Sequence, residues 1–234
     1  SGYEEMLLSD EAFAGGVSHR GRDGVFAMKL HEHDKYNGSL RASKSWFFFG
    51  NRIVCMGSDI ENKAGGGLHT TLFQNFLENV SDTLVVNGEA VTQFPYWAEL
   101  AGGAVLRDNL HNVWFVPEGK VCVTKRLQRS LDEETDASTQ NDFATAWIDH
   151  GSGVVSGGGY EYMLVVHASD GEAARYAREL PYEVLRRDAS AHILRDRLSG
   201  AVGYALFAPG KVGEGLLESV SLPSLVMIGG DGEG

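Results

Sequence analysis

The chain has 234 residues, of which 43% are hydrophobic, and its formal net charge is −12. This length suffices for one domain with its own core, and the acidic balance argues against a general nucleic-acid binder, which would present a basic face. No apolar run approaches the roughly 20 residues that a membrane-spanning helix needs, so no membrane association is expected.

Short runs of alternating hydrophobicity dominate the chain and predict strands. In order, these runs cover 25–30, 45–49, 52–56, 70–73, 83–86, 112–116, 120–125, 144–148, 160–166, 191–194 and 202–207. The pairs Gly50-Asn51 and Asn87-Gly88 lie between such runs and predict two-residue hairpin turns, because both residue types adopt positive φ cheaply. Many short strands indicate a mainly β fold, a large antiparallel β-sandwich of stacked sheets.

One short helix is expected near 171–180, with Asp170 as its N-cap and Pro181 as its stop. The acidic segment 130–142 predicts an exposed loop. The glycines of 151–159 resemble a phosphate-binding loop, but that motif requires a helix after it and a βαβ context. A strand-like run follows instead, so we expect a flexible loop. Residues 1–234 are predicted to form a single domain, and the start at Ser1 is interpreted as a cut inside a longer protein.

The polar motifs that suggest chemistry are each incomplete. His31 and His33 share one face of an expected strand, but no third metal ligand follows by spacing, which favours hydrogen-bonded histidines. Asp149 and His150 are adjacent and would face opposite sides of a strand. No Gly-x-Ser-x-Gly elbow positions a nucleophile. We expect Cys55 and Cys122 to be buried free thiols; a single disulfide between them is the alternative. We expect neither a metal nor a cofactor.

Two residue sets leave a choice between structure and ligand binding. The tryptophans form either core or a sugar-stacking platform. Some basic residues provide either solubilising charge at strand edges or a local groove for a polyanion. The tryptophans are Trp46, Trp97, Trp114 and Trp147, and the basic candidates are Arg41 and Lys44, or Lys125, Arg126 and Arg129.

The stretch from Ser39 to Gln74 reads SLRASKSWFFFGNRIVCMGSDIENKAGGGLHTTLFQ. A basic segment ending in Lys-Ser leads into a hairpin, followed by Gly-Ser-Asp-Ile and then Thr-Thr-Leu-Phe-Gln. This string resembles the central β-domain of the family-eight polysaccharide lyases, in their chondroitin sulfate ABC lyase branch. Later strings, FATAWIDHGS with GGGYEYMLVV and PYEVLRRDASAHILRDRLSGAVGYALFAP, resemble the same domain. The likeness runs from about Leu8 to about Ile228.

The resemblance implies a substrate class and a reaction. Family members cleave acidic glycosaminoglycans, such as chondroitin sulfate, dermatan sulfate or hyaluronan, by β-elimination. Most of their catalytic groups lie on an α/α-toroid domain that precedes the β-domain, and a Glu of the β-domain completes the site. Nothing in this chain reads as a series of long helices, so we expect the toroid to be absent from it and the isolated chain to be inactive. The implied partners are an acidic polysaccharide and other domains of the parent lyase, in a secreted or periplasmic location.

His69 stands where the family carries its Glu, directly before Thr70-Thr71-Leu72-Phe73-Gln74. A histidine gives no fixed negative charge near neutral pH. His69 is therefore either a catalytic residue of an altered site or a structural residue that ends a glycine-rich loop. Arg41 and Lys44 are the candidate substrate-binding residues. For the whole chain, the alternative is a non-catalytic carbohydrate-binding or structural β-sandwich module.

Overall fold

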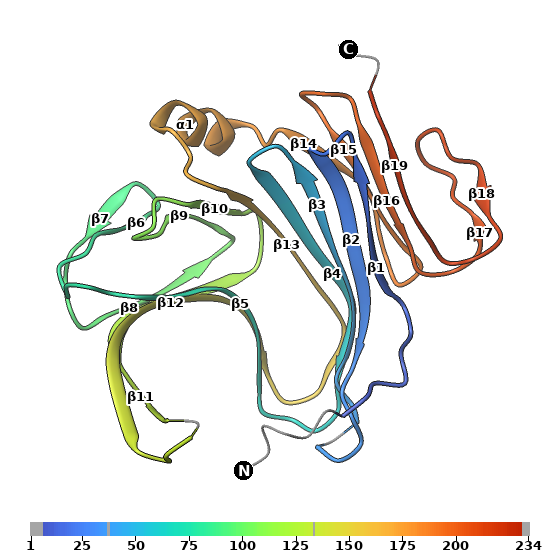
Figure 1. The fold of residues 1–234 in the computed structure, drawn as a ribbon. Coiled ribbons are helices and arrows are strands. Elements are labelled where there is room, and N and C mark those ends of the chain that lie inside the picture. The colour runs from blue at the N-terminus through green and yellow to red at the C-terminus, as the bar shows by residue number, and fades with distance from the viewer. Residues whose placement is uncertain (1–6, 37, 133, 231–234) are drawn as a thin grey trace.

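The structure is a computed structural model that describes residues 7–36, 38–132 and 134–230 (Figure 1). Strands dominate it, with the single helix α1 (Asp170–Arg178) near the top of the view. The strands are β1 (Ala14–His19), β2 (Asp23–His31), β3 (Arg41–Phe49), β4 (Arg52–Asn62), β5 (Gly67–Phe76), β6 (Leu84–Val86), β7 (Glu89–Val91), β8 (Tyr96–Ala101), β9 (Ala104–Arg107), β10 (Val113–Val116), β11 (Lys120–Leu131), β12 (Ser138–Ser152), β13 (Val155–Val165), β14 (Tyr182–Arg187), β15 (Ala191–Asp196), β16 (Val202–Leu206), β17 (Gly210–Lys211), β18 (Ser219–Val220) and β19 (Ser224–Ile228).

Three sheets form the layers. The central sheet has the order β1-β2-β3-β4-β13-β10-β9-β6-β7, the β5 sheet has the order β5-β12-β11-β8, and the β15 sheet has the order β14-β15-β16-β19. One apolar core fills the space between the central sheet and the β5 sheet. A second core lies between the central sheet, the β15 sheet and α1. The prediction of a mainly β, antiparallel sandwich of stacked sheets is confirmed.

Strand β3 shows why the middle layer has its unusual composition. Phe47 and Phe49 belong to the core shared with the β15 sheet, and Trp46 packs on the other side, against the core shared with the β5 sheet. A strand that is buried on one face and partly covered on the other reads as a continuous apolar run, because neither set of alternating side chains is fully exposed to water. Phe47 is fully buried, which contributes about 2–3 kcal/mol. Gly203 on β16 makes room for it, since a Cβ there would lie 2.5 Å from the Phe47 ring.

Both predicted hairpin turns are present. Phe49 pairs with Arg52 across Gly50-Asn51, and Gly50 has φ 61°. Val86 pairs with Glu89 across Asn87-Gly88, with φ 50° and 88°. These left-handed conformations carry little penalty for Gly and Asn, which is why the two pairs identify turns.

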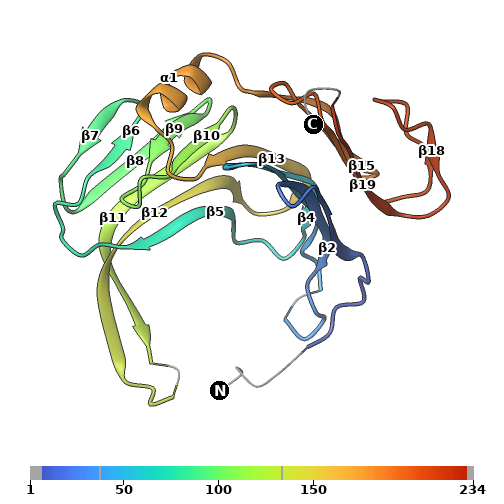
Figure 2. The ribbon, with the colours of Figure 1, turned by 45° about the horizontal axis from the view of Figure 1, so that its top comes forward.

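Two of the crossings between the central sheet and the β5 sheet lie next to each other. The chain passes from β4 into β5, and it returns from β12 into β13 (Figure 1). Gly65 and Gly66 (φ 79° and 89°) turn the first corner, and the Gly153 N–H donates to the Gly66 carbonyl at 3.1 Å. These two crossings join β5 and β12 to β4 and β13, which are neighbours in the central sheet (Figure 2).

Strands β11 and β12 extend beyond their outer neighbours. β8 pairs with β11 only up to Lys125, and β5 pairs with β12 only from Phe143 onward. Residues 128–131 and 138–141 pair with each other alone. They form a projecting two-stranded ribbon, which lies at the lower left of Figure 1.

Three local predictions need correction. The N-cap of α1 is Ser169 and not Asp170, which is already helical. The Ser169 hydroxyl accepts the Glu172 N–H, and the Glu172 carboxylate accepts the Ser169 N–H. The helix ends at Arg178. The segment 130–142 is mostly hairpin strand, since cross-strand pairing overrides its polar composition. Residues Val155–Gly159 begin β13, with register shifts that the glycines accommodate, and are therefore no loop.

Polar contacts join the central sheet to the β15 sheet. His192, fully buried, donates through Nε2 to the Ser58 hydroxyl (2.8 Å) and accepts the Ser45 hydroxyl at Nδ1 (2.7 Å). Burial lowers the pKa of His192 to about 3, so its imidazole stays neutral. Nearby, Arg52 forms a two-pronged ion pair with the fully buried Asp196. These contacts fix how the two sheets are aligned.

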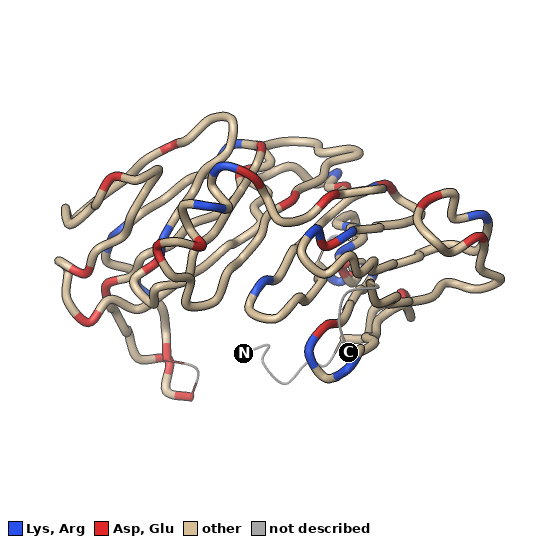
Figure 3. Tube along the Cα trace, turned by 90° about the horizontal axis from the view of Figure 1, so that it is seen from above, with Lys and Arg blue, Asp and Glu red and all other residues tan. Residues whose placement is uncertain are grey.

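Acidic and basic residues are interspersed along the trace, as Figure 3 shows. Among the described residues, no helix has the combination of length and apolar character needed to cross a membrane.

Candidate functional site

The outer face of the β5 sheet carries the site candidate. In β12, Ala144, Ala146 and Ile148 are buried in the core. Side chains alternate along a strand, so Thr145, Trp147 and Asp149 lie on the opposite, outer face. This places polar and aromatic groups on a surface that no other layer of the described structure covers.

Three rings form a row across this face. Trp97 on β8 is 56% exposed, and its ring lies 5.7 Å from that of Trp147. The ring of His69, on β5, lies 5.3 Å from Trp147 on the other side, tilted by 32°. Two buried polar atoms next to the row, Trp147 Nε1 and Thr124 Oγ1, have no hydrogen-bond partner among the described residues. A row of tilted rings with polar side chains at its end fits a ligand that has both apolar faces and hydroxyl groups.

A chain of charges ends at His69. Lys120 contacts both Glu99 and Asp149, at 3.2 Å each, and Asp149 Oδ1 lies 3.7 Å from His69 Nε2. The pKa of Asp149 is lowered, first by the Gly151 N–H that donates to it and then by Lys120. The same contacts, to Glu99 and Asp149, raise the pKa of Lys120. The face therefore presents an ionised carboxylate beside the His69 ring.

A polar groove of about 270 Å³ adjoins the row. Gln74, Gln128 and Asn141 are among its lining residues. The Gln74 amide donates to Gln128, which donates in turn to the Thr145 hydroxyl at 2.8 Å. Arg129, also at the groove, donates to Gln140 at 3.2 Å. Amide and guanidinium groups of this kind bind hydroxyl and acidic groups through directed hydrogen bonds.

The predicted site residues are only partly brought together. The His69 ring contacts Trp147, which in turn contacts Trp97, whereas Trp114 is buried and donates to Asp108. Arg41 lies exposed at the start of β3, and Lys44 lies farther along β3 on the central sheet. No contact among the described residues joins Arg41 or Lys44 to His69.

Several alternative motifs prove to be structural. Lys125 is fully buried and donates to the Asp82 carbonyl at 2.7 Å, so it belongs to no basic patch. His31 lies between the Asp10 carboxylate and the Gly38 carbonyl. Cys55 and Cys122 are both buried free thiols, so no disulfide joins them. The described residues contain no group of three or more metal-ligating side chains.

Sequence reasoning missed Asp149, Lys120 and Glu99 as neighbours of His69. The alternation in FATAWIDH places Trp147 and Asp149 on one face, which the sequence could have shown. Their position opposite His69 depends on the cross-strand register of β5 and β12. A register shift between Ala146 and Trp147 makes that pairing unreadable from the sequence.

Comparison with known proteins identifies the fold. Residues 1–177 match the super-sandwich domain of polysaccharide lyase family 8. The chain belongs to this family. It is 39% identical over 236 residues to a chondroitin sulfate ABC exolyase of Bacteroides thetaiotaomicron, and that match covers 97% of the chain but 22% of the relative. A chondroitin sulfate ABC endolyase of Proteus vulgaris is 31% identical, with 95% of the chain and 23% of the relative covered.

A solved structure shows the same architecture. The xanthan lyase of Paenibacillus superposes with a TM-score of 0.78 at 25% identity, covering 89% of this chain and 21% of that one. The super-sandwich chain thus spans about a fifth of the length of these relatives.

Proposed function

We propose that this chain is the super-sandwich part of a lyase that cleaves acidic glycosaminoglycans by β-elimination, and that the outer face of its β5 sheet forms one wall of the substrate cleft. The observation that carries the proposal is the ring row Trp97–Trp147–His69 beside the polar groove. Family membership, and relatives named for their action on chondroitin sulfate, support the substrate class.

The reaction defines what the wall must do. A base removes the C5 proton of the uronate, the C–H electrons form the C4–C5 double bond, and the C4–O bond breaks as the departing oxygen takes a proton. The uronate carboxylate must be neutralised for the C5 proton to become acidic. In this proposal the base, the acid and the neutralising group come from other domains of the parent protein, and this chain positions the sugar.

We assign His69 and Asp149 a joint role at the wall. Asp149 holds a carboxylate 3.7 Å from the His69 ring, which places negative charge next to the position where the family carries its Glu. Such a pair orients a cationic or hydroxyl group of a neighbouring domain, while His69 contributes its ring to the row. The secreted or periplasmic location of the parent lyase is part of the same proposal, because its polymeric substrate lies outside the cytoplasm.

Kinetics of the parent lyase on chondroitin sulfate test the proposal. Replacing Trp147 by Ala should lower kcat/KM on the order of tenfold, because a stacked sugar face is lost. His69→Ala should lower kcat by a similar factor, and Asp149→Asn should share that defect without an additive loss in the double variant. Leu222→Ala, an exposed apolar side chain between β18 and β19 and outside the wall, is the control that should leave the rate unchanged. Unchanged kinetics in all three test variants would contradict the proposal.

The isolated chain provides a second test. Without the groups that remove and supply protons, it should produce no unsaturated uronate from chondroitin sulfate, as measured by ultraviolet absorbance. A rise in absorbance would show that the chain holds a complete site.

A carbohydrate-binding module without a catalytic role is the second candidate. The exposure of Trp97 favours it, since a solvent-facing tryptophan on a regular sheet suits ligand binding without chemistry. Under this alternative, Trp97→Ala weakens sugar binding, while His69→Ala leaves the turnover of the parent lyase unaffected.

A further inference from the structure

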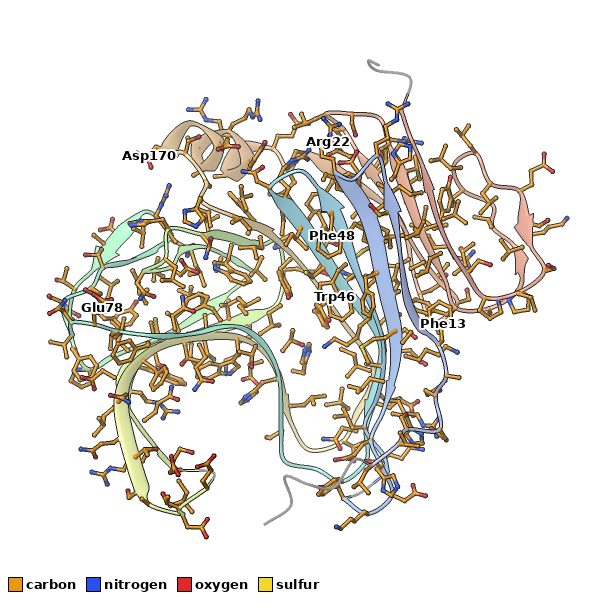
Figure 4. The ribbon with its side chains drawn as sticks, in the orientation of Figure 1. Phe13, Arg22, Trp46, Phe48, Glu78 and Asp170 are labelled. Carbon is orange, nitrogen blue, oxygen red and sulfur yellow. The ribbon has the colours of Figure 1, made fainter. Side chains whose placement is uncertain are left out.

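A second aromatic surface lies on the open part of the central sheet. Val25, Ala27 and Phe47 point into the core shared with the β15 sheet. Phe26 and Trp46 therefore point the other way, and they are cross-strand partners whose rings lie 5.5 Å apart. Phe48 follows Trp46 by two residues on the same face of β3 (Figure 4).

The neighbouring strand β1 leaves this surface uncovered. Its exposed residues beside β2 are small: Ala14, Gly16 and Ser18. Gly16 is the register partner of Phe26, and even a Cβ at this position would lie 3.4 Å from the Phe26 ring. Phe26 remains 37% exposed as a result. A hollow of about 450 Å³ adjoins Phe26 and Phe48 at the turn end of these strands.

A cation stands at each end of the aromatic row. Lys44 Nζ lies 5.4 Å from the centre of the Trp46 ring, and no described carboxylate forms an ion pair with it. Burial lowers the pKa of Lys44, because its ammonium group is less well solvated there than in water. Arg22, at the rim of the hollow, is 72% exposed and contacts Asp23 at 3.5 Å. Lys44 and Phe48 lie about 13 Å apart along β3, so the row is long enough for an extended ligand.

We propose that Phe26, Trp46, Phe48, Lys44 and Arg22 form a second binding site for an acidic polysaccharide, separate from the ring row of the β5 sheet. Aromatic rings pack on the apolar faces of sugars, and the two cations pair with carboxylate or sulfate groups. In a chain with a net charge of −12, Lys44 has no ion-pair partner among the described residues, and Arg22 stays exposed although it contacts Asp23. The two cations attract an anion locally. An acidic sugar chain satisfies both features, whereas an apolar protein partner would leave Lys44 buried without an anion.

The ligand class is that of the proposed function, so the test separates the two sites. A chondroitin sulfate hexasaccharide is titrated calorimetrically into the chain carrying Trp97→Ala and Trp147→Ala, in which the ring row is lost. Binding should persist. In this background, Lys44→Gln and Phe26→Ala should each raise Kd on the order of tenfold, and Arg22→Gln should raise it less, because Arg22 is well exposed. Arg178→Gln on α1 and Phe76→Ala on β5 are the matched controls and should bind as the parent chain does.

A measurement on the unmutated chain tests the same site without depending on whether the variants fold. The indole N–H resonance of Trp46 should shift on addition of the hexasaccharide, and a neutral oligosaccharide of equal length should produce no such shift. The second site would be overturned if Lys44→Gln and Phe26→Ala left Kd unchanged and the Trp46 resonance did not shift. The proposed function would stay intact in that case. Equal binding of the neutral sugar, or self-association of the chain through this face in sedimentation, would also overturn it.

Discussion

Histidines and carboxylates occur in two regions, the interface between the central and β15 sheets and the outer face of the β5 sheet. The two regions differ in how completely these groups find hydrogen-bond and ion-pair partners. His192 has a partner for each ring nitrogen, and Asp196 is paired with Arg52. On the β5 sheet, His69 stands 3.7 Å from its carboxylate and Trp147 Nε1 has no described partner. Fully paired polar groups stabilise and align layers, whereas incompletely paired ones remain available to a ligand.

The largest effect is expected from Asp196→Ala. This change leaves Arg52 buried without its carboxylate, so the free energy of unfolding should fall by about 3–5 kcal/mol, measured by denaturant titration. Asp170→Ala, which removes the exposed partner of Arg107, should cost less than about 1 kcal/mol. Equal losses in the two variants would mean that the buried interface is no more dependent on pairing than the surface is.

Gly203→Ala should follow, with a loss of about 3 kcal/mol. The new methyl group meets the Phe47 ring at 2.5 Å in a filled core, and overpacking of this kind typically costs about 1–3 kcal/mol. The matched control is Gly171→Ala, whose Cβ meets nothing within 4 Å. Adding Phe47→Leu to Gly203→Ala should restore part of the stability. A stable Gly203→Ala chain would show that the layers separate easily.

The pH dependence of stability distinguishes the buried histidine. The folded pKa of His192 is about 3 and the ordinary value is 6.5, so the unfolded chain binds the proton first as the pH falls. The contribution of neutral His192 to the free energy of unfolding is complete above pH 6.5 and is lost toward pH 3. The loss between pH 6.5 and about pH 5 is about 2 kcal/mol. His192→Gln should lack this component, and parallel unfolding curves for the two chains at both pH values would contradict it.

The smallest effect on folding is expected at Trp97. Since its side chain is 56% exposed, Trp97→Ala should lower the free energy of unfolding by about 1 kcal/mol or less, measured by thermal unfolding. Trp114→Ala, the buried counterpart with a bond to Asp108, should cost about 3–5 kcal/mol. If the two variants were equally unstable, the outer face would be structural, and the contrast between the two regions would disappear.

Local patterns in the sequence predicted much of the fold. Alternation located most strands, and Gly50-Asn51 and Asn87-Gly88 located two hairpins, because both signals depend on neighbouring residues. Strands β1, β7, β8, β9, β14, β17 and β18 were missed, since they are very short or mixed in composition and long-range pairing stabilises them. The same reason explains the error at 130–142, where the partner strand imposes an extended conformation on a polar segment.

The aromatic members of the candidate site were predictable from the sequence, but its charged members and their arrangement were not. His69 and the four tryptophans were identified beforehand from residue type and from the family resemblance. Which tryptophans meet His69 depends on the pairing of β5 with β12 and on the alignment of β8 with β11. A shift of one residue in either would turn the side chains to the other face, and the sequence does not encode that register locally.

The β11–β12 ribbon has a consequence for the order in which the molecule opens. Residues 128–131 and 138–141 have backbone partners only in each other, whereas Asp142 already accepts the Leu77 N–H. An isolated two-stranded ribbon is at most marginally stable in water. Its amides should exchange with solvent by local fraying, well before those of β12 from Phe143 onward. Because Gln128, Arg129 and Asn141 belong to this ribbon, a ligand in their groove must first quench its motion. The polar end of the wall therefore adjusts to its ligand, while the ring row next to it is already in place.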